Sequence, residues 1–141
     1  MSCLSDVMEK VIDIVKRDTN LKGVYWGDQL AFSDYPVACV GAPISYDEEF
    51  PVIAAQKVWE EKYTIEIIIF VRFADTSINA KEIITITDTL RNNLRGNLDL
   101  DSYVLMGDIG TTRYYIGTKT GDIIVRFSVT TVSYTKRIHS E

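Results

Sequence analysis

The chain has 141 residues, of which 46% are hydrophobic and 25% charged, and its formal net charge is −5 at pH 7. A chain of this length buries about two thirds of its unfolded surface, so we expect one domain over residues 1–141 that folds without disulfides. Residues 1–50 hold nine Asp and Glu against four Lys and Arg, and residues 51–141 hold eleven of each. Without a cluster of basic residues, tight binding to nucleic acid is not expected.

The two cysteines, Cys3 and Cys39, show no CxxC or Cys/His spacing, so we expect free thiols and no metal centre. The first residues lack the charged and apolar regions of a signal peptide. No stretch has the roughly 18 apolar residues of a membrane span. These features predict a protein made in the cytosol, with no membrane partner.

An amphipathic helix is expected at the start of the chain, ending near Asp18–Asn20. Asp6 and Glu9 lie in its first turn and Lys16 and Arg17 in its last, where the helix dipole favours them. Its apolar face repeats at helical spacing. This face consists of Leu4, Val7, Met8, Val11, Ile14 and Val15.

Two short strands are expected next, over 23–29 and 35–40, and Pro36 lies near the start of the second, where a missing N–H is tolerated. The connection 41–57 is long and has little regular pattern, apart from the acidic run Asp47–Glu49. Loops of this length in compact domains are often functional or disordered. It is either a solvated loop or an arm that orders against a partner, and its mixture of acidic and apolar residues favours the arm.

The segment 62–74 is the clearest strand of the sequence, because apolar and polar residues alternate along it. Ile68 and Phe70 interrupt its polar face. We therefore expect part of that second face to be covered by a neighbouring subunit or by another layer. The apolar face consists of Tyr63, Ile65, Ile67, Ile69, Val71 and Phe73.

A helix is expected directly after this strand. Asn79 is a candidate N-cap with Glu82 completing a capping box, Ile78 can pack on Ile83, and Gly96 can end the helix in a left-handed conformation. The competing interpretation is a strand, because this region is rich in β-branched residues. The signals at both ends favour the helix.

After a polar link at 97–101, the segments 111–116 and 122–136 are expected to form two strands joined by a glycine-flanked hairpin. The apolar positions of the last strand change phase, which predicts a β-bulge at Thr130–Thr131. The order of elements predicts an α+β fold. We expect a mainly antiparallel sheet of four or five strands with two helices packed on one face.

No pattern of catalytic residues stands out. The single histidine, His139, is the third residue from the end of the chain, where chains usually fray. Asp99, Asp101 and Asp108 lack the glycine and glutamate of a calcium loop. We expect no enzyme activity, catalytic residue, metal or cofactor.

Aromatic residues outside the periodic core favour a self-associating protein, because such residues are enriched at protein interfaces. The acidic connection, the outer face of the central strand and the last hairpin supply the candidate contacts. The candidate interface residues are Tyr46, Asp47, Glu48, Glu49, Phe50, Trp59, Ile68, Phe70, Arg113, Tyr114 and Tyr115.

The order of these segments resembles the tail terminator (tail completion) proteins of long-tailed bacteriophages, of the phage lambda type. An amphipathic helix is followed by Asp34–Val40, which begins Asp-aromatic-Pro, and by the acidic segment Tyr46–Glu49. Trp59 opens the alternating strand Tyr63–Phe73, and a helix and a closing hairpin follow. The resemblance covers nearly the whole chain and rests on element order and short patterns.

The resemblance implies a structural virion protein without catalytic activity. Members of this family form a ring, hexameric in the lambda type, that caps the tail tube, stops its polymerisation and provides the surface that joins the tail to the head. The implied partners are other copies of the chain, the tail tube protein and head–tail connector proteins, with phage DNA passing through the ring without specific binding. The implied location is the neck of the virion, after assembly in the host cytoplasm.

Two alternatives stay open at this point. Other phage neck and head-completion proteins share the same outline. A small cytosolic α/β domain that binds a ligand, or an enzyme subunit, belongs to a different class and requires a concave pocket with convergent polar groups.

Overall fold

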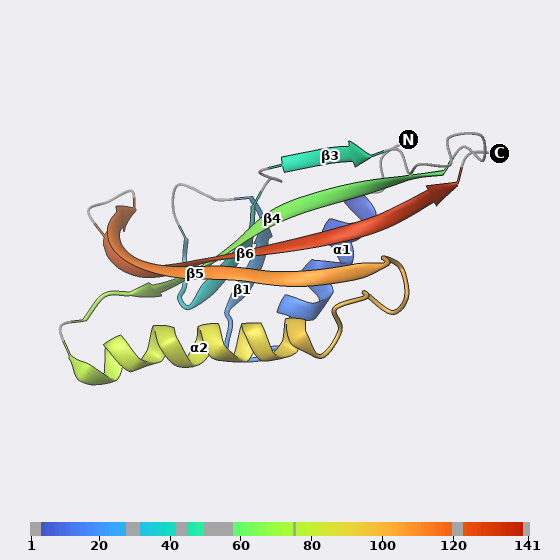
Figure 1. Cartoon of the computed structure of the whole chain (residues 1–141). Coiled ribbons are helices and arrows are strands. Elements are labelled where there is room, and N and C mark those ends of the chain that lie inside the picture. Colours follow the sequence, from blue (N-terminus) through green and yellow to red (C-terminus); the bar gives the residue numbers. More distant parts are fainter. Residues whose placement is uncertain are drawn as a thin grey trace.

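A computed structural model describes residues 4–27, 32–41, 45–49, 58–74, 76–119 and 123–139 of the chain. It confirms an α+β fold with two helices and a mostly antiparallel sheet (Figure 1). One strand, β3, was not predicted from the sequence. The elements are α1 (Leu4–Val15), β1 (Gly23–Trp26), β2 (Val37–Val40), β3 (Ser45–Glu49), β4 (Val58–Arg72), α2 (Ser77–Arg95), β5 (Met106–Lys119) and β6 (Ile123–His139).

The strands follow the order β1-β2-β4-β6-β5, and β3 also pairs with β4. The ladder between β4 and β6 is unbroken from Val58, opposite His139, to Arg72, opposite Val125. On its other side β4 pairs with β2 over residues 67–70 and with β3 over residues 60–64. Only β1 and β2 are parallel among the described strands. One edge of the sheet is therefore formed by β5, and the opposite edge by β1 and β3.

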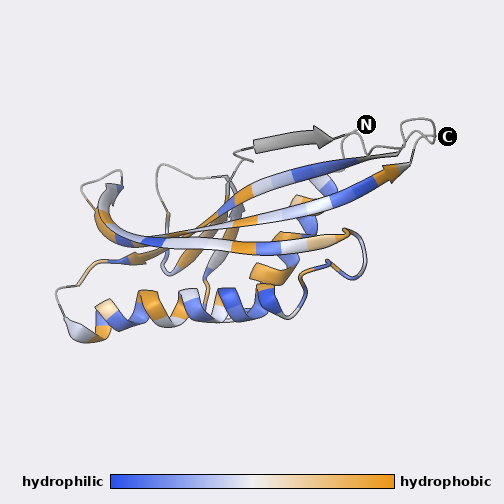
Figure 2. Ribbon diagram, in the orientation of Figure 1, coloured by the Kyte–Doolittle hydropathy of each residue, from blue (hydrophilic) through white to orange (hydrophobic). Residues whose placement is uncertain are grey.

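Both helices lie on one face of the sheet, which we call the inner face (Figure 1). The odd-numbered residues of β4 point towards them, and Ile65, Ile67 and Ile69 are fully buried, as the alternation predicted. Apolar and polar bands alternate along α2 (Figure 2), because the helix turns one side to the core. The buried residues of α1 are Val7, Met8, Val11, Ile12, Ile14 and Val15, and the buried hydrophobic residues of α2 are Ile83, Ile86, Leu90 and Leu94.

A smaller apolar cluster covers part of the opposite face, the outer face. Its centre is Phe70, which Phe32, from the segment before β2, approaches with a ring-centroid distance of 5.4 Å. The layer that covers the outer face at this point therefore comes from the same chain. The buried members of the cluster are Phe32, Val37, Cys39, Phe70 and Val125.

This second cluster explains the change of phase in the last strand. Val125 belongs to the outer cluster, whereas Val132 and Tyr134 belong to the inner core. The strand itself continues without interruption along β4, so the predicted bulge at Thr130–Thr131 is wrong. The irregularity lies in β5, where the residues between Ile109 and Thr112 are set against a single residue of β6.

The helix α2 begins earlier than predicted, and its N-cap is Thr76, whose Oγ1 accepts a hydrogen bond from the Asn79 N–H at 3.1 Å. The Asn79 side chain instead accepts from the Ala74 N–H and donates to Arg72 O, both at 2.9 Å. Ile78 is 78% exposed rather than packed on Ile83. Gly96 has a right-handed φ of −71°, and the left-handed residues come later, at 100–102.

Candidate interaction surface

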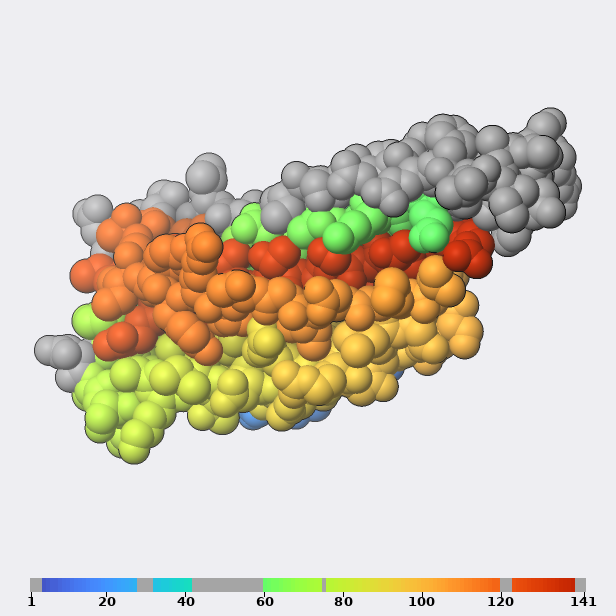
Figure 3. Space-filling view, in the orientation of Figure 1, coloured from blue at the N-terminus to red at the C-terminus, as the bar shows by residue number. Residues whose placement is uncertain are grey.

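The edge strand β5 lies at the surface between β6 and α2 (Figure 3). It is 14 residues long, and among the described strands it pairs only with β6. The backbone groups on its other side therefore find no strand partner in the part of the chain that the structure describes. A long edge of this kind is a template for pairing with a strand of another chain.

A short polar network holds the middle of β5 in place. The Arg91 side chain of α2 donates from Nη1 to Gly110 O at 2.8 Å and to Thr112 Oγ1 at 2.9 Å. The Thr112 and Thr130 hydroxyl groups lie 2.8 Å apart and share a hydrogen bond. These contacts tie the edge strand to the helix and to β6 at the bulge. The middle of the edge strand is therefore held by contacts within its own chain.

Exposed side chains gather on β5 just after the bulge. The exposed fractions of Tyr114, Tyr115 and Ile116 are 47%, 44% and 59%. Arg113 is also exposed, and it makes no hydrogen bond or ion pair with any described residue. Successive residues of a strand point to opposite faces, so this segment presents apolar area on both sides of the edge. Three of these four residues were predicted as interface residues, and Ile116 was not.

Tyr115 is the exposed end of an aromatic row across the outer face. Its ring stacks on Phe127 with a centroid distance of 5.1 Å, and Phe127 lies 5.5 Å from Phe70. The three residues occupy one register across β5, β6 and β4. Lys119 Nζ lies 4.4 Å from the Phe70 ring centroid. Because aromatic pairs contribute beyond the area they bury, this row holds Tyr115 in a defined position at the edge.

A hollow of about 360 Å³ lies beside β5, where the strand faces the N-terminal half of α2. Among the described residues that line it, Arg126 alone carries a cationic group, and the Arg126 Nε donates to Asn79 Oδ1 at 2.8 Å. Its remaining lining is aromatic and aliphatic. This combination suits an apolar or aromatic side chain of a protein partner. The lining residues are Ile83, Tyr114, Tyr115, Ile116, Arg126 and Phe127.

The other predicted contact segment lies on the opposite edge of the sheet. Part of the predicted loop 41–57 forms β3, which pairs with β4 in the same chain. The backbone of Tyr46, Asp47, Glu48 and Glu49 therefore belongs to an edge strand. Phe50 lies outside the described residues, and Trp59 is described only by its backbone, which pairs with Ile138. Most of the interface residues predicted from the sequence thus lie on β3 and β5, at two opposite edges of the sheet.

The two outer-face candidates differ in exposure. Ile68 is partly buried at the margin of the outer cluster. Phe70 is only 3% exposed, because Phe32 and Phe127 cover it. The prediction that Phe70 contacts a partner therefore needs correction, since its side chain is part of the subunit interior.

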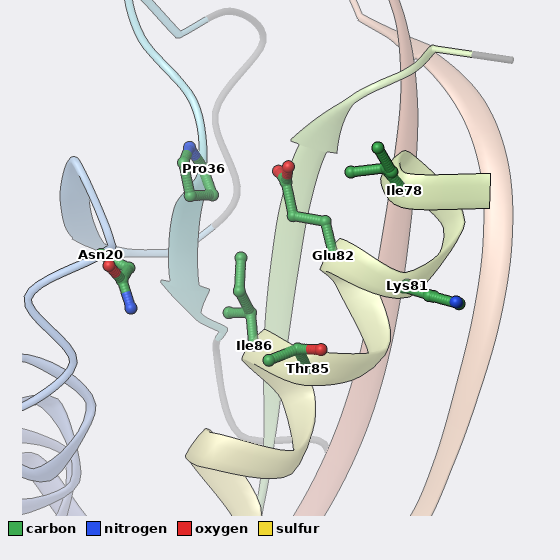
Figure 4. A pocket seen from close by; sticks show the side chains of 7 residues that line it. All are labelled: Asn20, Pro36, Ile78, Lys81, Glu82, Thr85 and Ile86. Carbon is green, nitrogen blue, oxygen red and sulfur yellow. The ribbon is translucent and has the colours of Figure 1, made fainter. Parts of the chain in front are cut away.

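A hollow of about 550 Å³ lies between the turn after α1, the start of β2 and the first turns of α2 (Figure 4). Glu82 and Ile86 point towards Pro36, whereas Lys81 points away (Figure 4). Its polar groups therefore do not converge on one point, as a site for a small polar ligand requires. Its lining residues are Asn20, Pro36, Ile78, Lys81, Glu82, Thr85 and Ile86.

Within the described ranges, no group of three or more His, Cys, Asp or Glu side chains is placed to hold a metal ion. Neither described helix is long and apolar enough to cross a membrane. Glu60 and Glu61 differ in environment: Glu61 is 1% exposed, with the Tyr63 hydroxyl donating to it, and Glu60 forms a 3.4 Å ion pair with Arg137. His139 pairs through its backbone with Val58 at the end of β6.

Comparison with models of known protein families and with curated protein sequences finds no match to this chain.

Proposed function

We propose that this chain is a structural subunit that assembles with copies of itself into a ring, and that the ring terminates the tail tube of a long-tailed bacteriophage. In this role the ring caps the tube, ends its polymerisation and offers its other side to the head connector. Phage DNA passes through the ring without specific binding. The mature location is the neck of the virion.

One observation carries the proposal: the two contact segments expected from the sequence lie on opposite edges of one sheet. Ring closure requires a heterologous contact, in which one surface of a subunit meets a different surface of the next. The acidic strand β3 and the exposed strand β5 are two such surfaces. The order of elements, which resembles the terminator family, supplies the phage assignment.

The exposed residues at β5 favour this function over a ligand-binding domain. Tyr114, Tyr115 and Ile116 offer apolar area on an edge that can accept another strand. The hollow beside Pro36 instead lacks convergent polar groups (Figure 4). A structural assembly therefore accounts for more of the described surface than a small-molecule site.

The proposal is tested by the mass of the protein in solution, measured by light scattering over a range of concentrations, followed by negative-stain imaging. We expect rings of about six copies of the 16.0 kDa chain, with a hole wide enough for duplex DNA. Tail tube protein that polymerises in the presence of these rings should give shorter, capped tubes. A monomer at every concentration, with no effect on tube length, would contradict the proposal.

A further inference from the structure

The directions of the strands restrict how two subunits can meet. β4 is antiparallel to β6, and β6 is antiparallel to β5, so β4 and β5 run in the same direction. β3 is antiparallel to β4 and therefore runs opposite to β5. When neighbouring subunits keep the same orientation along the sheet, the β5 edge of one subunit meets the β3 edge of the next as an antiparallel pair. This is the more stable arrangement of the two strand pairings.

The formal charges of the two edges are complementary. β3 has the sequence Ser-Tyr-Asp-Glu-Glu, with three consecutive acidic residues. The part of β5 beyond the bulge, residues 112–119, contains Arg113 and Lys119 and no acidic residue. Opposite charges on paired strands stabilise a sheet, and like charges destabilise it. Pairing of β3 with a second β3 would instead bring two acidic runs together.

Among the described edge strands, β1 is the other possible partner of β5. Its four residues, Gly23–Trp26, carry no charge, so β1 offers nothing that complements Arg113. The bulge separates residues 112–119 from the first part of β5, which contains Asp108. The basic part of β5 is therefore the part that suits an acidic strand.

We infer that residues 112–119 of β5 in one subunit pair antiparallel with β3 of the next subunit, and that Arg113 faces the acidic run Asp47–Glu49. This inference rests on the proposed ring and adds the two segments that form its subunit contact. At each junction the sheets of two subunits join into one continuous sheet. This is possible because β3 and β5 each have one side on which no described strand pairs. Because only this half of β5 pairs with β3, neighbouring subunits are displaced relative to each other along the strand direction. Neighbouring strands of a closed sheet with tilted strands are displaced in the same way.

The test uses two charge reversals, Arg113→Glu and the pair Asp47→Lys with Glu49→Lys, in the full chain. Each variant places like charges across every junction, so its dissociation constant should rise at least about tenfold. An equimolar mixture should assemble again, because each junction then joins either two reversed edges or two native edges. Circular dichroism and thermal melting establish that each variant folds. Arg95→Glu, an exposed residue of α2 with the same change of charge, is the matched control and should assemble like the native chain.

Light scattering distinguishes the outcomes. Loss of assembly in each variant and recovery in the mixture support the inference. Normal assembly of either folded variant, or a mixture that stays dissociated, overturns the inferred β5–β3 contact but not the proposed ring. If only Arg113→Glu loses assembly, β5 pairs with a second β5 or with β1 instead. Absence of any oligomer in the native chain, with no effect on the length of tail tubes, overturns the proposed function instead.

Discussion

The two faces of β4 differ in what covers them. On the inner face Ile65, Ile67 and Ile69 are each 0% exposed beneath two helices. On the outer face Phe70 is covered by a small aromatic cluster, whereas Glu66 is partly exposed. The alternation of a strand shows which residues share a face, but it does not show what lies on that face. Substitutions of Ile67 and Phe70 test this difference, and Tyr134→Phe, in the inner core on β6, has the smallest expected effect.

Ile67→Asp should abolish folding. The side chain is fully buried in the inner core, and an unpaired carboxylate there costs several kcal/mol, roughly the net stability of a domain. Circular dichroism and thermal melting measure the effect. Ile84→Asp is the control, because Ile84 on α2 is 47% exposed, and it should melt close to the native temperature. A soluble Ile67→Asp chain that melts cooperatively would show that the inner face is assigned wrongly.

Phe70→Ala should lower the free energy of unfolding by about 3–5 kcal/mol, as for other buried phenylalanines. Tyr115→Ala, in the same aromatic row but 44% exposed, should cost only about 1 kcal/mol. Urea unfolding of both variants measures the difference. If Phe70→Ala were as mild as Tyr115→Ala, the outer cluster would not be a second core.

Tyr134→Phe should leave stability at neutral pH unchanged or slightly higher. The Tyr134 hydroxyl is buried in the inner core without a hydrogen-bond partner among the described residues, and removing an unpaired polar group costs little. Burial raises the pKa of Tyr134 well above its usual value. Above about pH 10 the unfolded chain therefore releases a proton that the folded chain keeps, and stability falls by up to about 1.4 kcal/mol per pH unit from this residue.

Urea unfolding at pH 8 and pH 11 tests this pH dependence, with the native chain and Tyr134→Phe compared side by side. The variant should lose less stability between the two pH values. Equal losses would show that Tyr134 does not titrate differently in the folded and unfolded chains.

The sequence predicted elements with strong periodicity and missed those that depend on contacts. α2 was predicted as a helix, but four candidate capping residues, Asp75, Thr76, Ser77 and Asn79, lie close together. The tertiary structure determines which residue caps the helix. The Asn79 side chain forms hydrogen bonds with Arg72 O, the Ala74 N–H and Arg126, and Thr76 is the N-cap. β3 was missed because its acidic sequence has no apolar alternation, and its strand conformation depends on pairing with β4.

The candidate surface was predicted only in part, because sequence patterns do not show which side chains the tertiary contacts cover. Arg113, Tyr114 and Tyr115 were identified from residue type, and they are exposed on β5. Ile116 was missed, although it directly follows them, because an isoleucine in a strand is usually a core residue. Phe70 was assigned to the surface because the sequence gives no periodic signal for the segment that places Phe32 over it.

The central claim is that the free side of β5 is where a second copy binds, and amide hydrogen exchange measures this most directly. Exchange rates are compared at low and high protein concentration, with light scattering reporting the mass of each sample. We expect the amides of residues 112–119 that point away from β6 to become protected only in the oligomer, together with the amides of β3 that point away from β4, while the central strand β4 is protected in both samples. An oligomer in which these β5 amides exchange as fast as in the dilute sample would contradict the central claim.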